Sequence, residues 1–312
     1  MPECLPFSFE VEGAHRISYT IQLMAVILEG GCRVSEMREG AAVSNGTLRV
    51  WHQVGRAVGA QAISLRVLEL APGVSPEMCN ESCDEILYVL DAPWERRHPA
   101  CLNVNNEHVG ENEPVATIFI DDRAYEVGPA TGIYLRPGQA FSVDNPGPEP
   151  LVLISSQCPE PAQSASETAA TESRIASSSL GGRPAVAADS TVYGTLAAPI
   201  VRLADRPAQP TADRWYRVLV DDGIGSTNAT QFVGSIPPGR APDHFHHYEE
   251  VLFILRGEGR MWAGETNTPL AAGSCIYLPK GQVHCVENTG DGELRLLGVF
   301  YPAGSPSVRY EV

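Results

Sequence analysis

The sequence lacks the features of a secretory leader and of a membrane-spanning segment. Its first residues, MPECLPFSFEVEG, are acidic, whereas a signal peptide places basic residues before its apolar stretch. The apolar run at 21–28 is much shorter than the roughly 20 residues that a helix needs to cross a bilayer. We therefore expect a soluble, cytoplasmic protein.

Basic residues are also scarce. The 312 residues include 22 lysines and arginines against 38 aspartates and glutamates, which gives a formal net charge of −16. Binding to nucleic-acid phosphates requires Lys and Arg to displace counterions, and anionic membrane surfaces attract the same side chains. We therefore expect neither a nucleic-acid partner nor a membrane partner, and the acidic charge favours solubility.

Several motifs of other protein classes are missing. The sequence has no phosphate-binding loop, no nucleophile elbow and no coiled-coil heptads. Its eight cysteines are scattered and form no CxxC pair, so we expect them to be reduced and mostly buried, as in other cytosolic proteins. The chain is rich instead in turn formers, with 29 glycines and 25 prolines, and 43% of its residues are hydrophobic. This composition favours two domains built of many short strands.

One stretch, 239–288, concentrates residues that bind metals. His244 and His246 are two residues apart, so in an extended strand they point to the same face. Glu250 begins the apolar run that follows, and His284 comes after a Pro-x-Gly turn. Imidazole and carboxylate are ligands that divalent transition metals accept. The sequence therefore predicts one metal site, with the ligands His244, His246, Glu250 and His284.

Two neighbours of these residues have the wrong spacing for the site. We expect His247 to point away from the metal because successive strand residues alternate between faces, and we expect Glu249 to be a solvated side chain. The metal itself stays open, since Fe, Mn, Ni, Co, Cu and Zn all accept these ligands.

The spacing in this stretch resembles the two sequence motifs of the cupin superfamily. The first motif reads Gly, His-x-His, three residues, Glu, six residues, Gly, and its counterparts, with the first gap one residue short, are Gly239, His244, His246, Glu250 and Gly257. The second reads Gly, five residues, Pro-x-Gly, two residues, His, three residues, Asn, and its counterparts are Gly273, Pro279, Gly281, His284 and Asn288. The resemblance implies an all-β, double-stranded β-helix (jelly-roll) barrel, the four metal ligands named above and a catalytic role for Glu250.

An internal repeat extends this resemblance to the first half of the chain. The run at 133–145, IYLRPGQAFSVDN, aligns with the run at 276–288, IYLPKGQVHCVEN. The chain therefore resembles a bicupin, with two such barrels in tandem. At the ligand positions the first copy has Cys79, Glu81, Glu85 and Phe141. We interpret it as a degenerate, structural barrel without metal; the alternative is a site formed by Cys79 and Cys83 with Glu81 or Glu85, joined by Cys101 if the fold brings it close.

Composition sets the expected domain boundaries. Residues 1–45 form an N-terminal extension of uncertain order, 46–158 the degenerate barrel and 191–312 the metal-binding barrel. The segment 159–190 is rich in Ser, Ala, Thr, Pro and Glu and lacks apolar periodicity, so we expect a flexible linker. The exposed faces and edges of two such barrels need covering, which predicts close docking of the barrels or a homodimer.

The resemblance implies function only broadly, because fold does not fix activity. Three histidines and one glutamate resemble the sites of quercetinase-like dioxygenases and oxalate-decarboxylase-like enzymes, so we expect a metal-dependent enzyme that acts on a small organic molecule. The alternatives are a non-catalytic cupin that binds or stores a small ligand, a structural module with an incidental metal, and a metal-dependent isomerase or aminohydrolase. A basic anchor or a buried acid or base in the pocket would favour catalysis.

Overall fold

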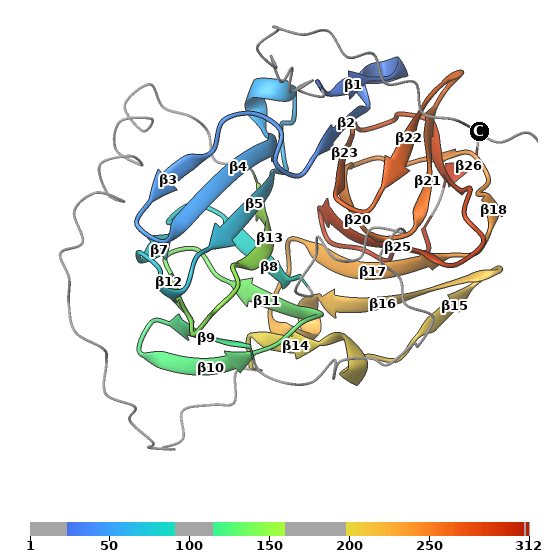
Figure 1. The fold of residues 1–312 in the computed structure, drawn as a ribbon. Helices are drawn as coiled ribbons and strands as arrows, with labels where there is room; N and C mark the ends of the chain where they lie inside the picture. Colours follow the sequence, from blue (N-terminus) through green and yellow to red (C-terminus); the bar gives the residue numbers. More distant parts are fainter. Residues whose placement is uncertain (1–23, 91–114, 160–197, 309, 312) are drawn as a thin grey trace, which may run out of the picture.

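The computed structural model describes residues 24–90, 115–159, 198–308 and 310–311 of the chain (Figure 1). The regular structure in these residues is almost all strand, so the prediction of an all-β fold is confirmed. Helical segments in the same residues are four short 3₁₀ turns, at Glu29–Gly31, Arg56–Val58, Leu203–Asp205 and Asp222–Ile224. None of the helices described is long and apolar enough to cross a membrane.

The N-terminal barrel is formed by two antiparallel sheets. The seven-stranded sheet has the order β14-β11-β8-β13-β5-β4-β3, and the five-stranded sheet has the order β10-β9-β12-β6, with β7 also paired to β12. The strands of the first sheet are β3 (Val43–Asn45), β4 (Leu48–Val54), β5 (Leu65–Leu70), β8 (Asp84–Val89), β11 (Thr131–Leu135), β13 (Leu151–Cys158) and β14 (Ile200–Arg202). Those of the second are β6 (Gly73–Val74), β7 (Met78–Cys79), β9 (Ala116–Ile120), β10 (Arg123–Val127) and β12 (Ala140–Asn145).

The C-terminal barrel repeats this arrangement. Its eight-stranded sheet has the order β1-β2-β23-β20-β25-β17-β16-β15, and its six-stranded sheet has the order β22-β21-β24-β19-β26, with β18 paired to β24. The larger sheet contains β1 (Val26–Ile27), β2 (Arg33–Glu36), β15 (Gln209–Thr211), β16 (Arg214–Val220), β17 (Thr230–Ile236), β20 (Glu249–Arg256), β23 (Ser274–Leu278) and β25 (Leu294–Tyr301). The smaller contains β18 (Gly239–Arg240), β19 (His244–Phe245), β21 (Glu258–Ala263), β22 (Thr266–Ala271), β24 (His284–Asn288) and β26 (Tyr310–Glu311).

Burial along the strands explains their sequence patterns. Strand β12 alternates between buried and partly exposed residues because one of its faces lines a barrel and the other meets solvent. Strand β8 is buried along its whole length, and β20 is buried from Glu249 to Ile254. A second layer therefore covers the outer face of these central strands, which accounts for their nearly continuous apolar runs.

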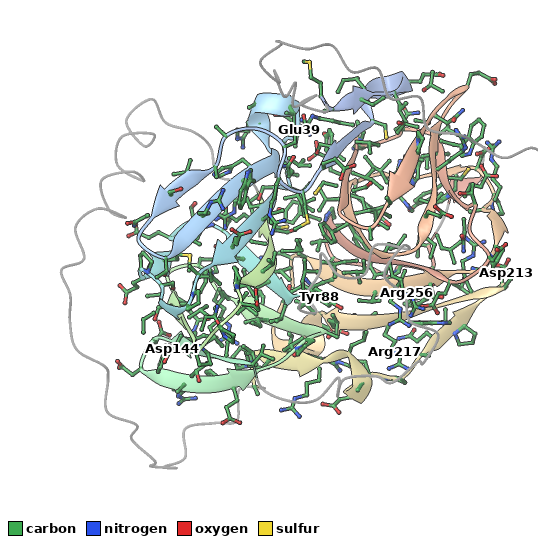
Figure 2. All side chains as sticks on the ribbon, viewed as in Figure 1. Glu39, Tyr88, Asp144, Asp213, Arg217 and Arg256 are labelled. Carbon is green, nitrogen blue, oxygen red and sulfur yellow. The ribbon has the colours of Figure 1, made fainter. Side chains whose placement is uncertain are left out.

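That second layer is the other barrel. One apolar cluster spans both barrels and includes Trp51, Ile86 and Tyr88 from the first and Val233, Phe253 and Tyr277 from the second. Side chains fill the region between the two sets of strands around Tyr88 (Figure 2). Each barrel also has its own interior cluster, centred on residues such as Leu87 and Phe141 in one and Leu252 and Phe300 in the other. The two barrels therefore dock closely, as expected from their exposed faces.

The barrels also exchange edge strands, so the strand pairing crosses the expected boundaries. Strand β2, from within 1–45, pairs with β23 of the C-terminal barrel, and β14, from within 191–312, pairs with β11 of the N-terminal barrel (Figure 1). Each exchanged strand covers a sheet edge that would otherwise expose unpaired backbone groups. The guanidinium of Arg33 on β2 donates to the carbonyl of Gln53 on β4 at 2.8 Å, so β2 also contacts the N-terminal barrel.

Two expectations lie partly outside the described residues. The expected linker at 159–190 falls, after Pro159, in a stretch that the structure does not describe, and so does Cys101. Cys79 is exposed and Cys83 is buried, where it accepts a hydrogen bond from the amide of Asn80.

Candidate metal centre

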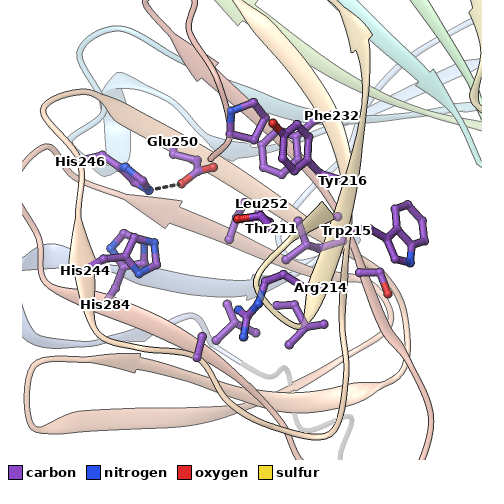
Figure 3. Close-up of a pocket in the computed structure, with 17 residues that line it drawn as sticks. Thr211, Arg214, Trp215, Tyr216, Phe232, His244, His246, Glu250, Leu252 and His284 are labelled. Carbon is purple, nitrogen blue, oxygen red and sulfur yellow. Dashed lines mark ion pairs between the residues drawn. The ribbon is translucent and has the colours of Figure 1, made fainter. Parts of the chain in front are cut away.

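The four predicted ligands come from both sheets of the C-terminal barrel. His244 on β19 is directly opposite His284 on β24. His246 follows β19 in the loop that leads to β20, and Glu250 is the second residue of β20, between β23 and β25 in the larger sheet. The side chains meet at one end of a cavity inside the barrel (Figure 3).

Three imidazoles form a tight cluster. One ring nitrogen each of His244, His246 and His284 lies within 4.8 Å of the other two. The carboxylate of Glu250 joins them through its Oε2 atom, which is 3.4 Å from Nε2 of His246. Within the part of the chain that the structure describes, this is the one cluster of three or more His, Cys, Asp or Glu side chains that could hold a metal ion.

Two of the rings are oriented by backbone carbonyls. Nδ1 of His244 lies 3.0 Å from the carbonyl oxygen of Pro242, and Nδ1 of His284 lies 2.8 Å from that of Gln282. A carbonyl oxygen only accepts hydrogen bonds, so Nδ1 carries the proton in both rings and Nε2 keeps its lone pair for a metal.

The third ring is held by stacking instead. Nδ1 of His246 is buried and has no hydrogen-bond partner among the described residues. Its ring stacks on Tyr248 with centroids 4.7 Å apart and planes 10° apart, and Tyr248 stacks in turn on Phe300 at 4.8 Å. Nε2 of the same ring lies 3.4 Å from Oε2 of the buried Glu250, and a cation bound to both atoms would stabilise them.

Burial adjusts the protonation of the cluster. Desolvation, with a smaller contribution from the neighbouring imidazoles, lowers the pKa of His246 to about 3. Desolvation and His244 lower the pKa of His284 to about 4. These two rings are therefore neutral near pH 7, which metal binding requires. Burial raises the pKa of Glu250 to about 8, because desolvation disfavours its negative charge.

The cavity beside the cluster has a volume of about 120 Å³. Apart from the four predicted ligands, its wall is mainly apolar, with Phe232, Ile236, Leu252, Val286 and Leu296 among its residues. The end of β15 adds Thr211 and the start of β16 adds Arg214. Sequence reasoning missed these two residues, because nothing in the sequence shows that the facing ends of β15 and β16 reach the cavity.

The expectation for Glu249 is wrong. This side chain is 8% exposed, and its carboxylate accepts hydrogen bonds from the backbone N–H groups of Gln61 and Ala62, at 3.0 and 2.7 Å, and from the hydroxyl of Tyr277 at 2.9 Å. Glu250 points into the barrel, so Glu249 points to the outer face of the sheet, and the other barrel covers that face. His247 is exposed and contacts Tyr310, with centroids 4.2 Å apart, as expected for a residue outside the cluster.

The corresponding place in the N-terminal barrel has a different register from the one expected. Met78, not Cys79, is paired opposite Phe141, because the loop before β8 is one residue longer than its counterpart before β20. Both side chains pack in the apolar interior. Glu85, the counterpart of Glu250, is bound by Arg66 at 2.5 Å and by the hydroxyl of Ser155 at 2.8 Å.

Comparison with known sequences gives matches to part of the chain. A family model described as "Cupin domain" matches residues 232–300. An uncharacterized protein of Aquifex aeolicus is 33% identical over 88 residues, which are 27% of this chain and 71% of that protein. The oxalate-binding protein of Thermotoga maritima is 36% identical over 66 residues, 20% of this chain and 54% of that protein. Auxin-binding protein 1 of Arabidopsis thaliana is 34% identical over 70 residues, 20% of this chain and 35% of that protein.

Solved structures match across both barrels. A variant of Bacillus subtilis oxalate decarboxylase has a TM-score of 0.63 at 14% sequence identity, covering 87% of this chain and 78% of that chain. Another structure of oxalate decarboxylase has a TM-score of 0.62 at 15% identity. At this identity the likeness concerns the fold. The duplicated barrel, the two motifs around the histidine cluster and these matches together show that the chain belongs to the cupin superfamily and is a bicupin.

Proposed function

We propose that the chain is a metal-dependent enzyme that acts on a small organic molecule in its C-terminal barrel. The ligands of one divalent transition-metal ion would be His244, His246, Glu250 and His284. The observation that carries this proposal is the cluster of three imidazoles whose nitrogens lie within 4.8 Å of one another at the end of a cavity. Imidazole with carboxylate suits Mn, Fe, Co, Ni, Cu or Zn.

The reaction class we favour is that of an oxidoreductase of the dioxygenase or oxalate-decarboxylase type. Among the structural neighbours, a study of Bacillus subtilis oxalate decarboxylase concerns its Mn(II) centres, which makes manganese the first metal to test. A bound ion of this kind would polarise an oxygen of the substrate or activate dioxygen.

The side chains around the site have roles of their own. Glu250 is the residue we propose as catalytic, because its buried carboxylate lines the cavity and its Oε2 atom lies 3.4 Å from Nε2 of His246, next to the place where a substrate would meet the metal. Phe232 and Leu252 form part of a wall that limits water beside the reacting atoms. Arg214 supplies the basic group in the pocket that favours catalysis over simple binding.

Turnover by the wild-type chain tests the proposal. The purified chain, loaded in turn with Mn, Fe, Co, Ni, Cu or Zn, would be screened for oxygen uptake and for consumption of small aromatic and carboxylic compounds, with His284→Ala as the inactive control. We expect turnover with at least one metal, at a rate that falls by about 100-fold or more in the variant, since typical acid–base and electrostatic contributions have that size. Equal rates for wild type and variant would contradict the proposal.

Binding without turnover is the second candidate. It is favoured by two relatives whose names describe binding proteins, the oxalate-binding protein and auxin-binding protein 1. In that case a ligand would bind in a manner that depends on His284, and the same compound would be recovered unchanged after prolonged incubation with the metal-loaded chain.

A further inference from the structure

The cavity of the C-terminal barrel has two chemically different ends. One end holds the three imidazoles and Glu250, and the other holds Thr211, the last residue of β15, and Arg214, the first residue of β16 (Figure 3). The rest of the wall includes the apolar side chains of Phe232, Ile236, Leu252, Val286 and Leu296. A ligand that spans the cavity therefore meets a cation at one end, hydrocarbon along its length and the metal-binding cluster at the other end.

Arg214 is suited to hold an anionic group. Its side chain is 16% exposed, and its Nε atom donates to Oδ1 of Asp213 at 3.0 Å. Asp213 is 64% exposed, so solvent screens this pair and weakens it. A guanidinium has five N–H donors in a planar fork that fits a carboxylate through two parallel hydrogen bonds. Among the residues that line the cavity, Arg214 is the one permanent cation.

The size and lining of the cavity limit what accompanies that anionic group. A dry apolar cavity of roughly 150 Å³ accommodates benzene, and this cavity measures about 120 Å³. Because this cavity is the smaller of the two, its apolar part takes at most one aromatic ring or a short alkyl chain. A two-carbon dianion such as oxalate would leave this wall without apolar contacts.

We propose that the natural ligand is a monocarboxylate with an apolar body of about one ring, held with its carboxylate on Arg214 and its other end toward the histidine cluster. This inference rests on the proposed function in taking the cluster as the reacting end, and it adds the class of substrate. It differs from an arrangement in which the carboxylate binds at the histidines.

Calorimetric titration of the full-length chain as purified tests the proposal. The probes are phenylacetate, 3-phenylpropionate, the neutral analogue 2-phenylethanol, and oxalate. The variants are Arg214→Gln, which removes the charge, and Arg214→Lys, which keeps the charge but not the planar fork. The matched control is Arg295→Gln, because Arg295, like Arg214, pairs through its Nε atom with a nearby carboxylate, that of Glu293 at 2.7 Å, but it does not line the cavity.

We expect at least one of the two phenyl carboxylates to bind, and to bind at least about tenfold more tightly than 2-phenylethanol or oxalate. Arg214→Gln should weaken its binding by about 10- to 100-fold, the usual range for a charge-assisted hydrogen bond, with Arg214→Lys in between and Arg295→Gln within about twofold of wild type. No binding of either phenyl carboxylate, equal affinity for the neutral analogue, or binding unaffected by Arg214→Gln would overturn the proposal. Binding lost in His284→Ala and kept in Arg214→Gln would place the carboxylate at the histidines and would also overturn it.

These outcomes separate this inference from the proposed function. If the chain carries no metal and catalyses no reaction, but phenyl carboxylates bind through Arg214, the proposed enzyme is wrong and the ligand class stands. If metal-dependent turnover occurs and the affinity for phenyl carboxylates is unchanged in Arg214→Gln, the proposed ligand class is wrong and the proposed enzyme function is supported.

Discussion

In the C-terminal barrel His244 faces His284 across two paired strands, whereas in the N-terminal barrel Met78 faces Phe141 across the equivalent pair. The surroundings of the equivalent carboxylates differ as well: Glu250 has His246 as its neighbour at 3.4 Å, whereas Glu85 has the permanent cation Arg66. One barrel thus gathers metal donors in its interior, and the other fills the same place with a methionine, a phenyl ring and a neutralised carboxylate.

The framework around these positions is the same in both barrels. The amide of Asn288 donates to the carbonyls of Ile236 and Gly292 at 2.8 and 2.7 Å. The amide of Asn145 makes the equivalent bonds in the first barrel, both at 2.9 Å. These bonds fasten the hairpin that carries His284 or Phe141, whatever residue stands there. The comparison teaches that the fold and the donor set are separable, so a donor can be removed without removing the barrel.

Substitution of His284 and of its counterpart Phe141 by alanine should give the largest effects, on metal binding in one barrel and on stability in the other. His284→Ala should lower metal affinity by more than about tenfold, because even the loss of a residue that hydrogen-bonds a metal ligand costs 10- to 100-fold. The same variant should leave the melting temperature of the metal-free chain unchanged. Phe141→Ala should leave metal content unchanged and lower the free energy of unfolding by about 3–5 kcal/mol, the usual cost of a buried Phe cavity. Metal analysis and denaturant unfolding of both variants check this, and equal metal loss in the two would break the comparison.

Substitutions of the adjacent residues Glu249 and Glu250 should affect different properties, stability in the first case and metal binding in the second. Glu249→Ala leaves the N–H groups of Gln61 and Ala62 without their acceptor between the barrels, so it should lower the free energy of unfolding by about 1–3 kcal/mol and leave metal content unchanged. Glu250→Gln should weaken metal binding and leave the contact between the barrels intact. Unfolding curves with metal assays distinguish the two variants, and metal loss in Glu249→Ala would contradict the division of roles.

Metal binding should release a proton at neutral pH. Burial raises the pKa of Glu250 from 4.5 to about 8, so between these values the metal-free native chain holds a proton that the unfolded chain releases, and its stability falls as pH rises. His246 and His284 act in the opposite sense: their pKa values fall from 6.5 to about 3 and 4, so stability falls as pH drops below 6.5.

Because both of these rings are neutral near pH 7, a cation that ionises Glu250 should release about one proton per metal bound. Calorimetry in two buffers of different ionisation enthalpy measures this number. The release should disappear in Glu250→Gln, and a heat of binding that does not depend on the buffer in the wild type would show that Glu250 is already ionised.

The smallest effect is expected in the N-terminal barrel. Cys79 is exposed and lies beside, not at, the position opposite Phe141. Cys79→Ser should therefore change neither metal content nor the free energy of unfolding by more than about 0.5 kcal/mol, as for most surface substitutions. Loss of metal from this variant would support the alternative of a metal site in the N-terminal barrel that includes Cys79.

The sequence predicted the tandem barrels and the position of the histidines because both depend on local spacing. Turn residues mark the strands, and residues two apart share a face whatever the rest of the chain does. The role of Glu249 could not be predicted, because it depends on the N–H groups of Gln61 and Ala62, which are distant in sequence. The pairing of β2 with β23 and of β14 with β11 could not be predicted for the same reason, because the partner of an edge strand depends on how the two barrels dock. Met78 was missed because one extra loop residue shifts the register of a strand.

The number of metal ions per chain tests the central claim most directly. Mass-spectrometric metal analysis of tag-free wild type, Phe141→Ala and His284→Ala, each loaded and then dialysed, gives this number for both barrels at once. The account predicts about one ion per chain in the wild type and in Phe141→Ala, and close to none in His284→Ala. About two ions per wild-type chain, or one full equivalent retained by His284→Ala, would contradict it.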